Sequence, residues 1–123
     1  MWKKVENRLV HTTDKNRITV QVRIDKDVLE KLHKLAEEHY STVSYLIENG
    51  IENILEKQIV HPNNPRDIRN RKVFRLGIDK DLYEELMRTV KKRGMKRSDI
   101  LEDSIHYIEY DKIKDRNWRY RIE

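Results

Sequence analysis

The sequence predicts a mainly α-helical fold with one short two-stranded antiparallel ribbon, built from two strand–helix–helix units in a single chain. One observation behind this prediction is an internal repeat, in which a copy that starts at Arg71 matches one that starts at Arg17, an offset of 54 residues without a gap. The other is that each copy places an alternating strand before two amphipathic helices. A unit of roughly 40 residues barely buries a core, and a lone strand has no partner. We therefore expect the two copies to pair as an intramolecular pseudo-dimer.

The matching positions stay in one frame along both copies. A repeat of this kind constrains the architecture more strongly than any single short motif. It divides the chain into a flexible basic arm (1–16), repeat 1 (17–58), a linker that contains two prolines (59–70), repeat 2 (71–111) and a basic, aromatic C-terminal extension (112–123). The identical pairs include Ile24 and Ile78, Asp25 and Asp79, Lys26 and Lys80, Asp27 and Asp81, Glu30 and Glu84, Leu32 and Leu86, Ser44 and Ser98, Glu48 and Glu102, Ile51 and Ile105, and Ile54 and Ile108.

Both predicted strands alternate between inward and outward residues, as half-buried strands do. In repeat 1 the inward residues are Val20, Val22 and Ile24, and the outward residues are Thr19, Gln21 and Arg23. In repeat 2 the inward residues are Phe74, Leu76 and Ile78, and the outward residues are Val73, Arg75 and Gly77. An antiparallel pair of these strands would cover a helical core with one face and expose the other.

Capping residues set the predicted helix ends. Asp25 and Asp79 stand at N-cap positions directly after the strands, and Thr42 is the expected N-cap of the second helix of repeat 1. Gly94 is expected just past the end of the first helix of repeat 2. Lys96 occupies the N-cap position of the last helix, where Ser or Thr is more usual, so this cap should be weak.

The second helix of each repeat carries a small residue at the same place, Gly50 in repeat 1 and Ser104 in repeat 2. A glycine inside a helix costs about 1 kcal/mol against alanine, so it needs a reason. A close crossing of the two helices would supply one. The apolar stripe of the last helix is expected to run from Ile100 to Ile108.

Composition narrows the function classes. The charged fraction of 40%, the net charge of +5 and the pI near 9.4 fit a nucleic-acid partner, and they fit a well-solvated helical surface equally well. The chain has no cysteine, which suits the cytoplasm, and no apolar run near the roughly 20 residues of a membrane span. The five histidines lack metal-ligand spacing, and no phosphate loop or nucleophile elbow is present. We expect no enzyme, no cofactor and no metal.

With these features in place, the chain resembles the ribbon-helix-helix family of bacterial and phage DNA-binding proteins, the Arc/MetJ-like repressors, in a tandem two-copy form. The resemblance covers both repeats, roughly two thirds of the chain. It rests on the alternating strand, the Ile-Asp-Lys-Asp-Val-Leu run of residues 24–29, and the helical hairpins. Residues 35–44 are similar to the passage between the two family helices, and residues 94–101 are similar to the family's Gly-x-x-x-Ser-x-hydrophobic turn.

The resemblance implies sequence-specific binding of double-stranded DNA, most simply by a transcriptional repressor that inserts its ribbon into the major groove. Arginine suits guanine, glutamine suits adenine, and Thr or Val can touch a thymine methyl. The start of each second helix is expected to hold a phosphate. The implied base-reading residues are Thr19, Gln21, Arg23, Val73, Arg75 and Gly77, and the implied phosphate-contacting residues are Thr42, Val43, Ser44, Lys96, Arg97 and Ser98.

Other roles stay open at this stage. The chain could serve as an accessory protein of a relaxosome or partition system, or as an antitoxin-like module that captures a protein partner through its C-terminal extension. The extension interleaves aromatic residues with arginines, which suits DNA backbone, a second copy on an adjacent site, or its own domain. At the outward position of Gly77, either the backbone approaches DNA closely or the position is silent.

Overall fold

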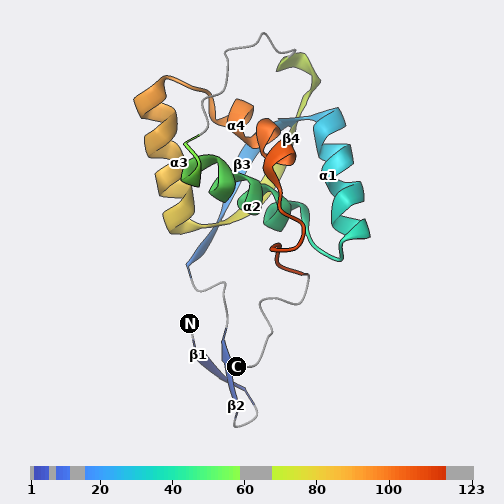
Figure 1. The fold of residues 1–123 in the computed structure, drawn as a ribbon, viewed down its shortest axis with the longest axis vertical. Coiled ribbons are helices and arrows are strands. Elements are labelled where there is room, and N and C mark those ends of the chain that lie inside the picture. The colour runs from blue at the N-terminus through green and yellow to red at the C-terminus, as the bar shows by residue number, and fades with distance from the viewer. Residues whose placement is uncertain (1, 6–7, 12–15, 59–67, 116–123) are drawn as a thin grey trace.

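The computed structural model describes residues 2–5, 8–11, 16–58 and 68–115 (Figure 1). It has the predicted mainly helical architecture, in which two strand–helix–helix units share one antiparallel ribbon. Repeat 1 supplies β3 (Arg17–Asp25), α1 (Lys26–Glu38) and α2 (Val43–Glu56). The 3-10 helix η1 (Ile68–Asn70) leads into repeat 2, which supplies β4 (Arg71–Asp79), α3 (Lys80–Arg93), α4 (Arg97–Asp103) and the 3-10 helix η2 (Ser104–Tyr107).

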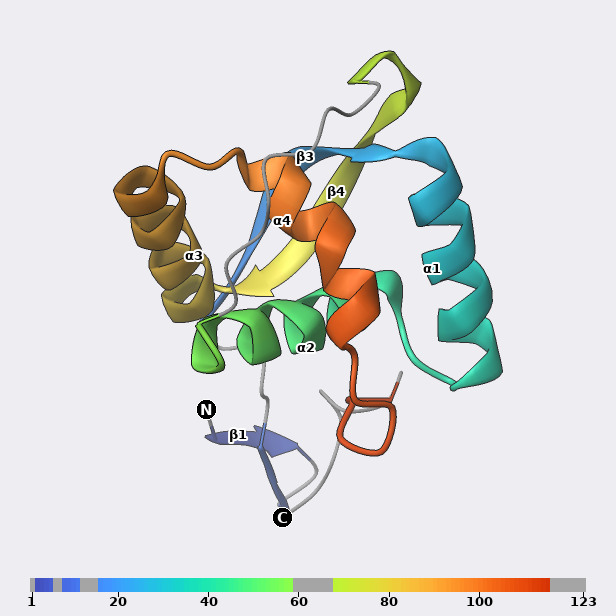
Figure 2. The ribbon, with the colours of Figure 1, turned by 45° about the horizontal axis from the view of Figure 1, so that its top comes forward.

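The register of the ribbon follows the symmetry of the sequence repeat. Gln21 lies opposite Arg75, and these two residues are also equivalent positions of the two copies. The local pseudo-twofold axis therefore passes between them. Four of the six residues predicted to face inward, Val22, Ile24, Leu76 and Ile78, are fully buried. The other two, Val20 and Phe74, are partly buried and pack against the core. α1 and α3 lie on opposite sides of the ribbon, and α2 and α4 lie against one of its faces (Figures 1 and 2).

The predicted caps account for the starts of α1, α2 and α3 and for the end of α3. The side chain of Asp25 accepts hydrogen bonds from the backbone N–H groups of the first turn of α1, and Asp79 does the same for α3. Thr42 Oγ1 accepts from the N–H of Tyr45 at 3.1 Å. Gly94 ends α3 with a positive φ of 62°, which glycine adopts without steric cost. Lys96 makes no side-chain cap, as expected for lysine at this position.

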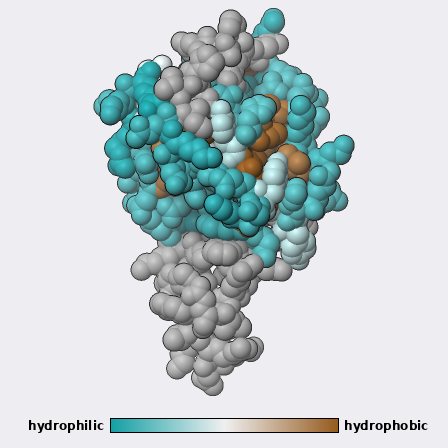
Figure 3. Space-filling view, viewed as in Figure 1, coloured by the Kyte–Doolittle hydropathy of each residue, from teal (hydrophilic) through white to brown (hydrophobic). Residues whose placement is uncertain are grey.

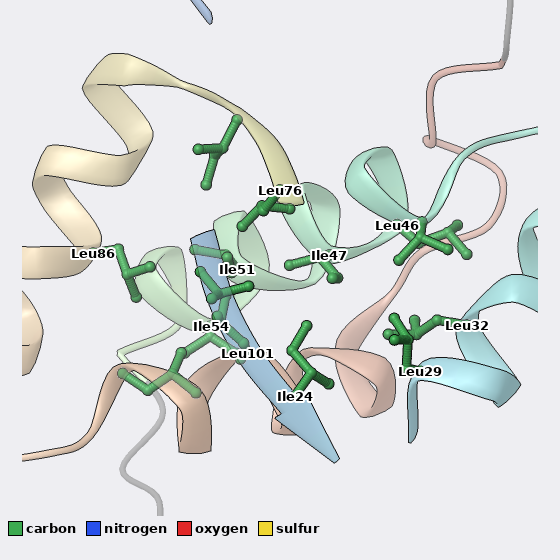
Figure 4. Close-up of a cluster of buried hydrophobic side chains, with 14 of the residues drawn as sticks. Ile24, Leu29, Leu32, Leu46, Ile47, Ile51, Ile54, Leu76, Leu86 and Leu101 are labelled. Atoms are coloured by element: carbon green, nitrogen blue, oxygen red, sulfur yellow. The ribbon is translucent and has the colours of Figure 1, made fainter. Parts of the chain in front are cut away.

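One apolar core joins the two repeats. Its members come from both strands and all four helices, and Figure 4 shows side chains from α2, α3, α4 and the ribbon pointing toward one another. The two repeats contribute unequally, because α1 buries three residues and α3 buries only Leu86. Figure 3 shows that hydrophilic residues cover most of the surface over α3. Among the described residues, no helix combines the length and apolar character needed to cross a bilayer.

The small residues Gly50 and Ser104 lie at the predicted close crossing. A Cβ atom on Gly50 would lie 2.3 Å from the carbonyl oxygen of Ser104 and 2.7 Å from its Cβ. Both distances are far below van der Waals contact, and the first involves backbone that cannot swing aside. A glycine is therefore required at this position of α2, where it faces η2.

We expect Gly50→Ala to lower the free energy of unfolding by about 1–3 kcal/mol, the usual cost of overpacking, in spite of alanine's better helix propensity. Urea unfolding followed by circular dichroism measures the change. Gly77→Ala is the matched control, because the nearest atoms to its added Cβ lie 3.9 Å away. The control should change stability by less than about 0.5 kcal/mol. An unchanged Gly50→Ala midpoint would contradict the close crossing.

The structure differs from the sequence prediction at two places. The last helix was expected to reach Ile108, but α4 ends at Asp103 and a 3-10 turn follows to Tyr107. Side chains of α2 explain this ending. Asn53 donates to the carbonyl of Tyr107 at 2.6 Å, and Asn49 accepts from the N–H of Glu109 at 2.8 Å. Both backbone groups would otherwise belong to a continued helix.

The second difference lies in the N-terminal segment. Strands β1 (Trp2–Val5) and β2 (Arg8–His11) pair antiparallel where an arm without regular structure was expected. Both segments contain valine, and β1 also contains tryptophan, and these residues favour strands. Residues 12–15 of the arm, 59–67 of the linker and 116–123 of the C-terminal extension lie outside the described residues.

Candidate nucleic-acid interface

The outward face of the β3–β4 ribbon presents the six residues that the sequence singled out. We call this set the ribbon face: Thr19, Gln21, Arg23, Val73, Arg75 and Gly77. Five of them are exposed and Gly77 is partly buried. Val73 is 50% exposed, which is high for an apolar side chain. Because the opposite face of the ribbon is locked into the core, these side chains project from a rigid platform.

The strand register arranges the ribbon face in three cross-strand pairs. Thr19 lies opposite Gly77, Gln21 opposite Arg75, and Arg23 opposite Val73. Arg23 is thus a diagonal neighbour of Arg75, at a spacing of about 7–8 Å between Cα atoms for this geometry. The exposed row contains two cations and no acid. Its chemistry suits hydrogen-bond acceptors and negative potential.

Two hydrogen bonds hold the backbone of Gly77 in place. Its N–H donates to Ser44 Oγ at 3.1 Å, and its carbonyl accepts from Arg17 Nη2 at 2.7 Å. A Cβ at this position would meet only ordinary contacts at 3.9 Å. The lack of a side chain on Gly77 is therefore no requirement of the fold.

The predicted phosphate-contacting residues of repeat 1 surround the start of α2. Thr42 is engaged as the cap, and the side chain of Val43 is buried at 6% exposure, so only the backbone of Val43 is available to a ligand. Ser44 is partly buried, and its hydroxyl oxygen accepts the N–H of Gly77, which leaves the hydroxyl proton to donate elsewhere. No charged side chain belongs to this set.

The corresponding residues of repeat 2 are different in character. Lys96 is exposed, and Arg97 and Ser98 are partly buried. The guanidinium of Arg97 donates to the Tyr83 hydroxyl at 2.7 Å and to the carbonyl of Gln21 at 3.0 Å. It thereby joins α3 and α4 of repeat 2 to the central residue of the repeat 1 strand, and places a cation beside the ribbon face.

Two buried glutamates link the two repeats on the core side of the ribbon. The sequence prediction gave them no role. Glu48 in α2 and Glu102 in α4 are 2% and 5% exposed. Arg17 reaches Glu48 at 2.8 Å, and the equivalent Arg71 reaches Glu102 at 2.8 Å. Glu48 and Glu102 occupy equivalent positions of the two repeats. An identical charged residue at the same place in two mainly apolar helices was the feature of the sequence from which their role could have been predicted.

Each of these glutamates also accepts a hydrogen bond from a backbone N–H group of the other repeat. Glu102 accepts the backbone N–H of Asp25 at 2.7 Å, and Glu48 accepts that of Asp79 at 3.3 Å. The two N–H donors belong to the capping residues that follow β3 and β4. The duplicated network therefore fixes the angle at which each strand enters its first helix.

The hydrogen bonds of this network stabilise the charged forms of Arg71 and Asp25. The hydrogen bond to Glu102 raises the pKa of Arg71, against the opposing effect of burial, and Asp99 raises it further. Burial by itself raises the pKa of Asp25, but hydrogen bonds from the Asn70 side chain and from two backbone N–H groups hold it below the ordinary value. Arg71 and Asp25 are therefore both charged at neutral pH.

The described part of the C-terminal extension, with the residues just before it, packs on repeat 1. Lys114 Nζ lies 2.8 Å from Glu48, and the carbonyl of Lys114 accepts from Ser41 Oγ. The ring of Tyr110 stacks on His39 with centroids 4.2 Å apart. The aromatic and arginine residues that suggested a DNA-gripping tail, from Arg116 to Arg121, lie outside the described residues.

No protein-family model, curated protein or solved structure matches the chain. The fold itself is that of two strand–helix–helix repeats with an antiparallel ribbon, which resembles a single-chain ribbon-helix-helix pseudo-dimer. Within the described ranges, no three His, Asp or Glu side chains gather in a way that could hold a metal ion. The feature with a defined chemistry is the exposed, cationic ribbon face.

Proposed function

We propose that this chain is a tandem ribbon-helix-helix protein that binds double-stranded DNA sequence-specifically, most simply as a transcriptional repressor. The observation that carries the proposal is the ribbon face, a row of exposed polar and basic side chains on a two-stranded ribbon whose other face is core. A two-stranded ribbon fits the major groove of B-DNA, which is about 12 Å wide.

The side chains of the ribbon face match the donor and acceptor pattern of the major groove. Arg23 and Arg75 each suit a bidentate contact to guanine, and Gln21 suits adenine. Their diagonal spacing of about 7–8 Å is close to two base-pair steps of about 3.4 Å. Thr19 and Val73 carry methyl groups for contact with thymine. Each good bidentate pair contributes about 1–3 kcal/mol of discrimination.

The two halves of the DNA site need not be equal. Repeat 1 presents Thr19, Gln21 and Arg23, and repeat 2 presents Val73, Arg75 and Gly77 at the equivalent positions. Most pairs of equivalent residues therefore differ in what they can recognise, so we expect a target without palindromic symmetry. Phosphates beside the groove would be held by the backbone at the start of α2, and by Lys96 and Arg97 of repeat 2.

Photo-cross-linking tests where DNA binds. A photoreactive phenylalanine analogue at Gln21 should cross-link a random-sequence duplex pool, because Gln21 lies at the centre of the ribbon face. The same analogue at Glu30, an exposed position in the middle of α1, should give little product and serves as the control. Equal cross-linking at both positions, or product only at Glu30, would place the DNA elsewhere.

A further inference from the structure

The turns between the two helices of each repeat have opposite charge. In repeat 1, α1 ends with Glu37 and Glu38, both exposed. In repeat 2, the equivalent residues of α3 are Lys91 and Lys92, also exposed, and Arg93 follows. The pseudo-twofold axis relates these two turns, so one end of the ribbon is flanked by acids and the other by bases.

The residues that follow the first helix of each repeat also differ in charge. The turn of repeat 2 adds Lys96 and Arg97, whereas the equivalent residues of repeat 1 are Thr42 and Val43. We call the set Lys91, Lys92, Arg93, Lys96 and Arg97 the basic turn. Arg97 donates to the carbonyl of Gln21, so this member of the basic turn lies directly beside the ribbon face.

The three lysines of the basic turn are exposed to solvent. None of the ion pairs that the structure gives among described residues involves Lys91, Lys92 or Lys96. The acids nearest in sequence are Glu84 and Glu85, in the first half of α3, and Asp99, which is engaged by Arg71. Three exposed lysines without a carboxylate partner in the described structure leave a cationic surface for an external anion.

The opposite turn is occupied by the chain itself. Tyr110 stacks on His39, and the carbonyl of Lys114 accepts from Ser41. Both contacts lie between α1 and α2, where the basic turn has its counterpart. The turn of repeat 1 is thus acidic and partly covered, whereas the turn of repeat 2 is basic.

We infer that the basic turn is a one-sided DNA-backbone site, which binds phosphates that flank the groove on the repeat 2 side only. This inference rests on the proposed DNA binding and adds that the protein contacts the two flanks of its DNA site unequally. Lys91 and Lys92 extend the contact beyond the start of α4, whereas Glu37 and Glu38 repel phosphate at the other end. The chain then binds its site in one orientation, with more of the DNA backbone held on one flank.

Two measurements on the full-length chain and a duplex selected from a random pool test this inference. Ethylation interference should show more essential phosphates on one flank of the ribbon site than on the other. Removing two phosphate contacts in Lys91→Ala/Lys92→Ala should lower the slope of log affinity against log salt by about 1.8, since each contact contributes about 0.9. Circular dichroism confirms that the variant is folded.

A second variant, which adds lysines to repeat 1, is matched to the variant that removes them from repeat 2. Glu37→Lys/Glu38→Lys gives repeat 1 the charges of the basic turn, and should extend the interference pattern on its own flank. A symmetric pattern for the unchanged chain, or an unchanged salt slope in the Lys91→Ala/Lys92→Ala variant, would overturn the one-sided site while leaving DNA binding intact. Failure of the unchanged chain to bind any duplex would overturn this inference and the proposed function together.

Discussion

Replacing Arg23 and Arg75 together by alanine is expected to weaken binding to a selected DNA site by between about 30-fold and 10⁴-fold. Each bidentate arginine–guanine contact is worth about 1–3 kcal/mol, and 1.4 kcal/mol is a factor of ten in affinity. Both side chains are exposed on the ribbon face, so their removal leaves the core unchanged. Fluorescence anisotropy with the selected duplex and with a scrambled duplex measures the loss.

The comparison between duplexes separates base reading from simple charge. Affinity for the scrambled duplex should fall much less, because it depends only on phosphate attraction. Lys31→Ala/Lys34→Ala removes the same charge from exposed positions of α1 and is the control. If the arginine variant lost affinity equally for both duplexes, or no more than the lysine variant did, the ribbon face would not be the base-reading surface.

Glu102→Ala is expected to lower the free energy of unfolding by about 3–5 kcal/mol, because it breaks a buried ion pair and leaves its partner charged. The side chain of Arg71 is only 8% exposed and would lose one of its two carboxylate partners, so that only Asp99 would remain beside it. The N–H of Asp25 would lose its acceptor in the other repeat as well. Small domains have a total free energy of unfolding of only about 5–15 kcal/mol. The expected loss is therefore a large fraction of the total stability.

Urea unfolding at neutral pH, followed by circular dichroism, measures the effect of Glu102→Ala. Glu84→Ala, at an exposed position of α3, is the control and should change stability by less than about 0.5 kcal/mol. A loss below about 1 kcal/mol in Glu102→Ala would mean that the cross-repeat network contributes little to joining the two copies.

Local sequence rules predicted most of the fold. Period-two alternation identified β3 and β4, and the caps at Asp25, Asp79, Thr42 and Gly94 identified the starts of α1, α2 and α3 and the end of α3. The repeat restricts the register of a symmetric ribbon to those in which a residue lies opposite its own equivalent, as Gln21 and Arg75 do, but it does not say which residue that is. The alternation of inward and outward residues identified the exposed face of the ribbon. The ribbon face was therefore accessible from the sequence alone.

The features that the sequence did not reveal depend on contacts between distant segments. The end of α4 is set by Asn49 and Asn53, which lie more than 50 residues earlier in the chain. The burial of Glu48 and Glu102 becomes understandable only when Arg17 and Arg71 are seen beside them. No local pattern encodes such pairings, and periodicity places a glutamate near an apolar stripe on the solvent side by default.

Selection of bound sequences from a random duplex pool by the unchanged chain, at near-physiological salt, tests the central claim most directly. Major-groove reading by the ribbon face predicts enrichment of one short motif without palindromic symmetry, bound by a single chain. If no motif is enriched and the residual binding disappears as salt rises, only phosphate attraction is present. That result would contradict sequence-specific recognition, and capture of a protein partner would become the leading function.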